Sequence, residues 1–363
     1  RVSPSEVREA LQGRLKASSG ALTPMLIAVE LKASGQTSRM KEMSEMTCPQ
    51  MFGTGSLNTA ARYISLLCLC LPGSLALGAK SAGESPVDPD GSLVRVGDTF
   101  SLPDGPAWDG SGELVVSDVK DQSVHCYRPV EKSWKAVPIE SARYSGFFVQ
   151  CGTLYAADNG NGVVRRFPGM TPEQIDAAET YSLGEPDKKG KPPRPNDLVV
   201  DRQGNIYVTV TGRNEVVCVR SDGTTSVATT GVISPNGITM SPDEKTLYVA
   251  SYKPKTIEKF PVVSPGVLGD QQRFAVMDDG DAPGADGMAI DSAGNVYCAG
   301  ATAVWIWNSA GQLLETVECP TRPINATFGG ADRKTLFIAC FDGVHALPMK
   351  ISGVKPADGL QAN

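Results

Sequence analysis

The stretch SPNGITMSPDEKTLYVAS, residues 234–251, decides the fold because the chain carries near-copies of it on both sides. RPNDLVVDRQGNIYVTV occupies residues 194–210, and ADGMAIDSAGNVYCAG occupies residues 285–300. Each copy opens on an amide or carboxylate beside a small or acidic residue. An apolar strand, a turn rich in Pro, Asp, Gly and Ser, and a second strand with Tyr near its start follow. Such a unit is a two-stranded hairpin that recurs along the chain.

Six such units follow one another from about Leu93 onward. Their opening residues are Asp104, Ser145, Asn196, Asn236, Asp286 and Asn325. Further strand-like text follows most units, so each repeat of about 40–50 residues holds up to four strands. The sequence therefore predicts an all-β protein, a six-bladed β-propeller over residues 93–350, followed by a C-terminal tail over 351–363. A β-sandwich is the alternative, but its strands would not repeat one polar residue at one place six times.

The opening residues are expected to form a ring, because equivalent positions in radial repeats lie at the same height around the axis. The ring would hold two carboxylates, three amides and a hydroxyl, and no Cys, His or Lys. Facing carboxylates are unfavourable unless they are neutralised. Oxygen donors of this kind suit a hard divalent cation such as Ca²⁺. The alternative is that these residues only form the turns that open the blades.

The first ninety residues differ from the repeats. Residues 1–45 are unassigned, and the expected true start is Met46 or Met51. Over residues 46–79, Arg62 precedes an apolar run from Ile64 to Leu77, and small residues follow. This order is typical of a signal peptide, which predicts an exported protein, periplasmic or extracellular, with residues 80–92 as a linker. A membrane anchor and a buried segment are the alternatives, but Pro72 would break a spanning helix, so no stable membrane insertion is expected after cleavage.

The composition of the chain argues against some classes of binding partner and some catalytic mechanisms. The net charge of −6, without a basic stripe, argues against nucleic acid. Outside the leader there are six cysteines, without zinc-type spacing; Cys218, Cys298 and Cys340 lie in apolar strand text and are expected as buried free thiols. His125 and His345, the two histidines, fall in strand text away from the ring, and no G-x-S-x-G elbow occurs. A histidine dyad and a serine nucleophile are therefore disfavoured.

The ordered motifs DGPAWD, RPNDLVVDRQGNIYVT, SPNGITMSPDEKTLYVAS, ADGMAIDSAGNVYCAG and NATFGGADRKTLFIA resemble the SMP-30/gluconolactonase/LRE-like family over about residues 94–350. The resemblance implies one divalent metal on the propeller axis, most often Ca²⁺ and in some members Zn²⁺ or Mn²⁺. It also implies hydrolysis of sugar lactones or related esters, so the expected partner is a small-molecule substrate.

The resemblance also implies roles for individual residues. The metal ligands would be Asp104, Asn236 and Asp286, with Asn196 as a further ligand or as the holder of a metal-bound water. Arg194 would contact substrate oxygens. Asp286 would serve as general base for the attacking water or relay a proton to the leaving hydroxyl, while the metal polarises the carbonyl.

One departure from the family pattern bears on the metal. The family usually opens this motif with Glu, whereas this chain has Asp104, whose carboxylate is retracted by about one C–C bond, roughly 1.5 Å. A lower metal affinity is the expected result. Two other functions stay open: a non-catalytic propeller that binds a ligand on the same face, and a hydrolase of phosphoesters or phosphofluoridates.

Overall fold

The computed structural model describes residues 83–97, 100–140, 143–280, 282 and 284–355. The signal peptide expected over 46–79 and the unassigned residues 1–45 lie outside these described residues. Among the residues described, no helix is both long enough and apolar enough to cross a bilayer.

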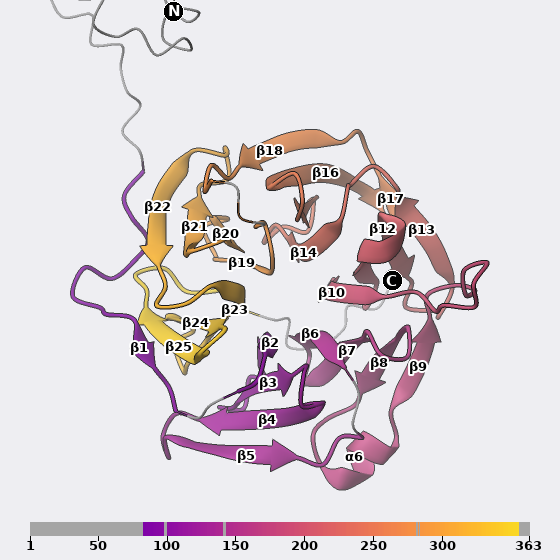
Figure 1. The fold of residues 1–363 in the computed structure, drawn as a ribbon, viewed down its shortest axis with the longest axis horizontal. Helices are drawn as coiled ribbons and strands as arrows, with labels where there is room; N and C mark the ends of the chain where they lie inside the picture. Colours follow the sequence, from indigo (N-terminus) through magenta and orange to yellow (C-terminus); the bar gives the residue numbers. More distant parts are fainter. Residues whose placement is uncertain (1–82, 98–99, 141–142, 281, 283, 356–363) are drawn as a thin grey trace, which may run out of the picture. The chain divides into compact units, whose positions relative to one another are not determined.

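Six antiparallel sheets are arranged around a common centre, which confirms the predicted six-bladed β-propeller (Figure 1). In each blade the first strand after the opening motif lies innermost and the others follow outward. Blade one consists of β2 (Pro103–Trp108), β3 (Leu114–Asp118), β4 (Ser123–Arg128) and β5 (Ser133–Val137). Blade two consists of β6 (Tyr144–Gln150), β7 (Thr153–Asp158), β8 (Val163–Phe167) and β9 (Glu179–Ser182), with α6 (Pro172–Asp176) before β9.

The next three blades repeat this plan. Blade three consists of β10 (Pro195–Val200), β11 (Ile206–Val210), β12 (Glu215–Val219) and β13 (Thr225–Thr229), with the short 3₁₀ helix η1 (Thr211–Arg213) after β11. Blade four consists of β14 (Pro235–Met240), β15 (Thr246–Ser251), β16 (Thr256–Ser264) and β18 (Gln272–Val276), and β17 (Val267–Leu268) also pairs with β16. Blade five consists of β19 (Met288–Ile290), β20 (Val296–Ala299), β21 (Ala303–Trp307) and β22 (Leu313–Glu318).

Blade six is completed by a strand from the start of the domain. It contains β23 (Pro323–Gly329), β24 (Thr335–Cys340) and β25 (Gly343–Pro348), and its outermost strand is β1 (Val94–Arg95). The Val96 N–H donates to the Val344 carbonyl at 2.9 Å. The Trp134 indole of blade one donates to the Val96 carbonyl at 2.7 Å. These bonds join the first and last blades and close the ring.

The turns between the first two strands of a blade are built by side chains of the repeat itself. In blade three, the Asp201 carboxylate accepts hydrogen bonds from the backbone N–H groups of Gln203 and Asn205. In blade five, Asp291 does the same for Ala293 and Asn295. An aspartate that satisfies the backbone of the following residues stabilises a tight turn. This explains the recurring Asp-x-x-Gly-Asn text.

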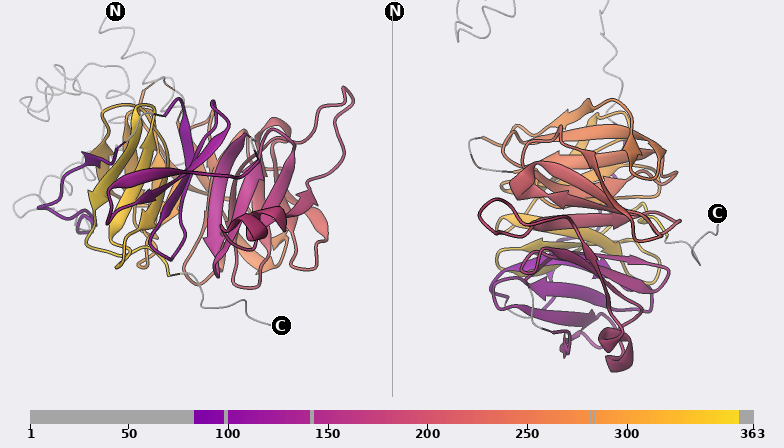
Figure 2. Two further views of the ribbon diagram at one scale, coloured as in Figure 1. Left: turned by 90° about the horizontal axis from the view of Figure 1, so that it is seen from below. Right: turned by 90° about the vertical axis from the view of Figure 1, so that its right-hand side faces the viewer.

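The tyrosine that begins the second strand of most units packs between neighbouring blades. Tyr155, Tyr207 and Tyr297 are almost completely buried. Tyr297, for example, contacts Phe328 of blade six edge to face, with ring centroids 5.1 Å apart. Burying a large aromatic side chain contributes about 1.5–3 kcal/mol. Figure 2 shows the resulting arrangement, in which each twisted sheet packs face to face with the next.

The closure of the ring generates a first prediction. Val96→Pro removes the N–H that bonds to Val344 and leaves that carbonyl without its partner, whereas Val96→Ala shortens the side chain and keeps the bond. We expect Val96→Pro to lower the free energy of unfolding by about 1–3 kcal/mol more than Val96→Ala does. Denaturant unfolding of both variants measures the difference, and equal stability of the two would show that this bond does not secure the closure.

Candidate active site

A bulge in the inner strands turns the opening side chains away from the regular sheet register. The pairing of the first and second strands is interrupted between Asp104 and Ala107, between Pro195 and Leu198, and between Pro235 and Ile238. Blades two and six have the same interruption at the start of their inner strands. Bulges re-aim side chains and are common beside active sites. The residues of the repeated opening motif therefore form a bulge whose side chains face the centre.

Glycines beside the opening residues let neighbouring blades approach each other closely. A Cβ at Gly105, where φ is +55°, would lie 2.8 Å from the Gly146 Cα, and a Cβ at Gly146 would lie 2.6 Å from the Asp197 Oδ1. A Cβ at Gly287 would overlap with the Asn325 side chain. Only residues without a Cβ fit at these contacts. The backbones of adjacent inner strands thus meet, and the ring side chains are brought to a small central space.

Three carboxylates and two amides lie together at this centre. Asn325 Nδ2 donates to Asp104 Oδ1 at 3.4 Å and to Asp197 Oδ2 at 3.5 Å. The Asn236 side chain hydrogen-bonds to Asp286. Oxygen-bearing side chains from five blades therefore converge, as the ring hypothesis expects.

Burial and mutual repulsion hold the protons on these acids. Loss of water raises the pKa of Asp104 well above its usual value, and the charges of Asp286 and Asp197 raise it further. Burial also raises the pKa of Asp197 and that of Asp286 to about 7 in each case. A cation bound beside these acids would lower their pKa values and stabilise their ionised forms.

Arg322 supplies one positive charge to this centre. Its guanidinium lies 3.1 Å from Asp286 Oδ2 and lowers the pKa of Asp286 against the effect of burial. It also donates to the Tyr252 hydroxyl at 2.8 Å and lies over the rings of Tyr252 and Phe341. Phe341 is half exposed, with 51% of its surface accessible. Asp286 thus sits beneath a cationic and aromatic group that borders on solvent.

Thr209 supports the centre from the second strand of blade three. Its hydroxyl donates to the Asn236 carbonyl at 2.6 Å, and it accepts a hydrogen bond from the Asp197 N–H at 3.0 Å. Asp118 and Asp158, which end the second strands of blades one and two, bond to the segments beside them. Asp118 accepts from the N–H groups of Ser101 and Leu102, and Asp158 pairs with Arg165.

Arg194 and Asn196 lie on the segment that leads into the inner strand of blade three. Asn196 is partly exposed at the start of β10, and Arg194 is exposed and donates to Asn159 Oδ1 at 3.4 Å. The preceding connection from β9 projects at the periphery rather than over the centre (Figure 1). Substrate contact by Arg194 and metal binding by Asn196 both stay predictions.

Two residues of the site were missed by the reasoning from sequence. Asp197 occupies the position that is glycine in four other units, Gly105, Gly146, Gly237 and Gly287. An acid in a column of glycines was the signal that could have indicated it. Arg322 precedes Pro323 and the Asn325 unit, just as Arg194 precedes Pro195 and Asn196, and this parallel was the signal for Arg322.

The residues at the centre fit a hard divalent cation. If ionised, Asp104, Asp197 and Asp286 carry three negative charges, against the single positive charge of Arg322. The amide oxygens of Asn236 and Asn325 lie beside them, and oxygen donors of this kind are those that Ca²⁺ prefers. The two histidines lie elsewhere: His125 bonds to Ser123 and His345 bonds to Asp342. Cys218, Cys298 and Cys340 are buried and unpaired, as expected.

Comparison with known proteins gives the same family. A model of the SMP-30/gluconolactonase/LRE-like region matches residues 102–341. Pentonolactonase XacC of Haloferax volcanii is 26% identical over 264 residues, which cover 69% of this chain and 86% of that protein. A gluconolactonase of Zymomonas mobilis is 25% identical over 288 residues, covering 69% and 79%. The solved structure of a gluconolactonase from Xanthomonas campestris has a TM-score of 0.63 and 26% identity, covering 73% of this chain and 91% of that one.

The repulsion among the acids predicts how stability depends on pH in the metal-free protein. Asp197 has a pKa of about 7 in the folded protein, above its value in an unfolded chain, so folding favours the protonated form. The stability that the protonated acid contributes is complete at low pH and is lost as the pH rises toward 7. With chelator present, we expect Asp197→Asn to gain stability over wild type between pH 4.5 and pH 8, on the order of a few kcal/mol.

Thermal or denaturant unfolding at several pH values measures this gain. Asp270→Asn, at an exposed position, is the matched control and should follow wild type at every pH. A difference between Asp197→Asn and wild type that does not change with pH would contradict the assignment of a strained charge at Asp197.

Proposed function

Since the chain belongs to the SMP-30/gluconolactonase/LRE-like family, we propose that it is a metal-dependent lactonase that hydrolyses a sugar lactone or a related ester. The observation that carries the proposal is the convergence of three carboxylates and two amides beneath Arg322 at the centre of the propeller. The matched relatives support it, because they are named as a pentonolactonase and a gluconolactonase.

The residues that would hold the metal are Asp104, Asn196, Asn236 and Asp286. Ca²⁺ is the ion that we propose first, because the donors are oxygens; Zn²⁺ and Mn²⁺ are the alternatives. When bound, the ion supplies a Lewis acid that polarises the lactone carbonyl and stabilises the negative charge that develops on its oxygen. The shorter acid at Asp104 should weaken this binding relative to family members with Glu.

Asp286 is proposed as the general base. Burial places the pKa of its carboxyl at about 7, which suits a group that must take up and release a proton near neutral pH. In the proposed reaction, Asp286 accepts a proton from the attacking water as that oxygen bonds to the carbonyl carbon. The bond to the ring oxygen then breaks, and the proton passes to the alkoxide that leaves.

Other side chains would orient the reacting groups. Arg322 contacts one oxygen of Asp286 and keeps part of its ionised form at neutral pH, because a guanidinium charge favours the carboxylate. The hydrogen bond from Asn236 fixes the same carboxylate. Arg194 would bind hydroxyl or carboxylate oxygens of the substrate with its planar donors. A polyhydroxylated lactone offers acceptors for these groups.

The role of Asp286 is tested by Asp286→Asn, which keeps the shape and an oxygen donor but removes the base. We expect the rate of lactone opening to fall by about 10²–10⁴-fold, even with metal in excess. Asn236→Ala is the comparison, because it should mainly weaken metal binding, so that added metal restores part of the rate. Proton release during turnover of a panel of lactones, at several metal concentrations, provides the measurement.

Two results would redirect the proposal. Undiminished turnover in Asp286→Asn would remove this residue from the mechanism. If the metal-loaded wild type opens no lactone in the panel, a non-catalytic binding propeller or phosphoester hydrolysis would be favoured instead.

We also propose that the protein is exported. The mature chain should then begin shortly after Gly78 or Ala79, because small residues follow the apolar run of the expected signal peptide. N-terminal sequencing of material purified from the native cells determines the start. A soluble cytosolic protein that retains residues 46–79 would contradict export.

A further inference from the structure

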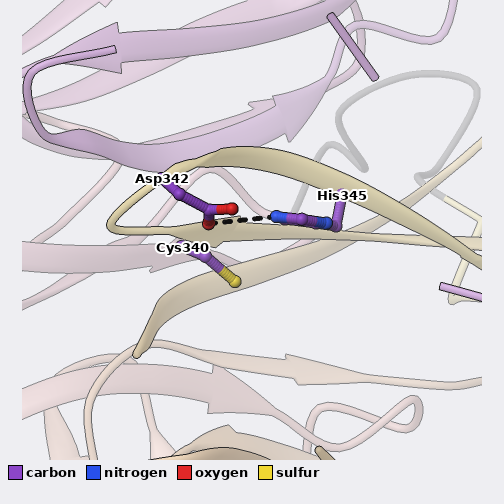
Figure 3. A group of neighbouring side chains, drawn as sticks. All are labelled: Cys340, Asp342 and His345. Carbon is purple, nitrogen blue, oxygen red and sulfur yellow. Dashed lines mark hydrogen bonds and ion pairs between the residues drawn. The ribbon is translucent and has the colours of Figure 1, made fainter. Parts of the chain in front are cut away.

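A second group of ligating side chains lies in blade six, outside the central ring. Cys340 ends β24, Asp342 lies in the tight turn that follows, and His345 lies on β25 (Figure 3). One ligand atom from each residue lies within 4.8 Å of the other two. His345 Nε2 and Asp342 Oδ1 are 3.1 Å apart. The hairpin therefore presents a sulfur, an imidazole nitrogen and a carboxylate oxygen to one small region.

Two members of this group are buried in the hairpin. Cys340 has no accessible surface, and His345 is 3% exposed. Asp342 also accepts from the Thr321 hydroxyl at 2.5 Å, and the Asp342 backbone N–H donates to the same hydroxyl at 3.1 Å. The connection from blade five thus packs directly on the ligating turn.

A second thiol from that connection reaches the group. Cys319 follows β22, and its N–H donates to the Thr302 carbonyl at 3.0 Å. A hydrogen bond between the two thiols lowers the pKa of Cys319 and raises that of Cys340. Cys319 therefore lies beside Cys340, but its sulfur is outside the group of three whose ligand atoms lie within 4.8 Å of one another, so it would have to shift to complete the site.

We propose that Cys340, Asp342 and His345, with Cys319 as the fourth donor, bind a zinc ion. Zinc is bound in proteins by Cys, His and Asp in tetrahedral sites, whereas Ca²⁺ takes oxygen donors only. Ligand atoms of such a site lie about 3.3–3.8 Å apart, as calculated from the usual zinc–ligand distances. Among Cys340, Asp342 and His345 the separations of 3.1 Å to at most 4.8 Å require side-chain shifts of about 1 Å or less.

The charges are consistent with this ion. Zinc binding displaces the protons of the Cys thiols, so the thiolates of Cys340 and Cys319 and the Asp342 carboxylate would carry three negative charges against the two positive charges of the metal. His345 remains neutral as a ligand. The ligands would thus supply all the negative charge that the cation requires.

The position of the site suggests a structural role in closing the ring. His345 is the register partner of Arg95 on β1, and Cys319 belongs to the connection between blades five and six. An ion held by both segments would fasten the last blade to its neighbour and to the closing strand. Because such an ion binds the folded chain, it should raise the unfolding temperature.

The proposal is tested with Co²⁺ and Zn²⁺ alone on the reduced, metal-free full chain. Co²⁺ should produce a thiolate-to-cobalt charge-transfer band at one equivalent, and Zn²⁺ should abolish it and raise the unfolding temperature. Cys340→Ser and His345→Gln should each lower the affinity at least about 10-fold, because even groups that only orient metal ligands contribute 10–100-fold. Removal of Cys319 should shift the band if it is the fourth ligand.

Two controls separate this site from other effects. Cys218→Ser alters an equally buried thiol in blade three and should leave the band and the Zn²⁺ effect unchanged. Asp286→Asn should leave the thiolate band unchanged, because the central ring holds no thiol; this keeps the proposal separate from the proposed lactonase activity. Absence of the band in reduced wild type, or its persistence at full strength in both Cys340→Ser and His345→Gln, would overturn the proposal.

Discussion

The close approach of the six inner strands is the constraint on which the rest of the structure depends. Where Gly105 faces Gly146, and where Gly287 faces Asn325, no side chain fits between the blades. Bulges in the inner strands of blades one and six then turn Asp104 and Asn325 toward the axis. The contacts that pack the inner strands therefore also bring the side chains of the site together.

This arrangement makes ionisation of the three central acids unfavourable. Asp104, Asp197 and Asp286 share a confined space in which their carboxyl groups have lost most of their contact with water, so that each favours its protonated form. Arg322 offsets the charge of Asp286 alone. When ionised, the acids where the inner strands meet carry more negative charge than Arg322 balances. A bound cation would therefore stabilise the centre.

The repeated text predicted the propeller and most of the ring, because both follow from one residue recurring at one place in each blade. Asp197 was not predicted, because the alignment of the six repeats assigns a single ring position to each unit. The bulge between Pro195 and Leu198 takes two successive residues out of register, and the second of them faces the centre. Arg322 lies before the repeat, and although its place before Pro323 parallels that of Arg194, its contact with Asp286 is visible only in the three-dimensional arrangement.

The strand that closes the ring could not be predicted for a related reason. β1 is only two residues long, and its partner β25 lies some 250 residues further along the chain. A pairing so short and so distant leaves no periodic signal. Nevertheless it places β1 beside the hairpin that carries Cys340, Asp342 and His345.

The short connection between blades five and six links the two groups of ligating side chains. Thr321 bonds to Asp342 of the hairpin, and the next residue, Arg322, bonds to Asp286 of the centre. The same connection thus provides a hydrogen bond to the hairpin of blade six and the guanidinium that offsets the charge of Asp286.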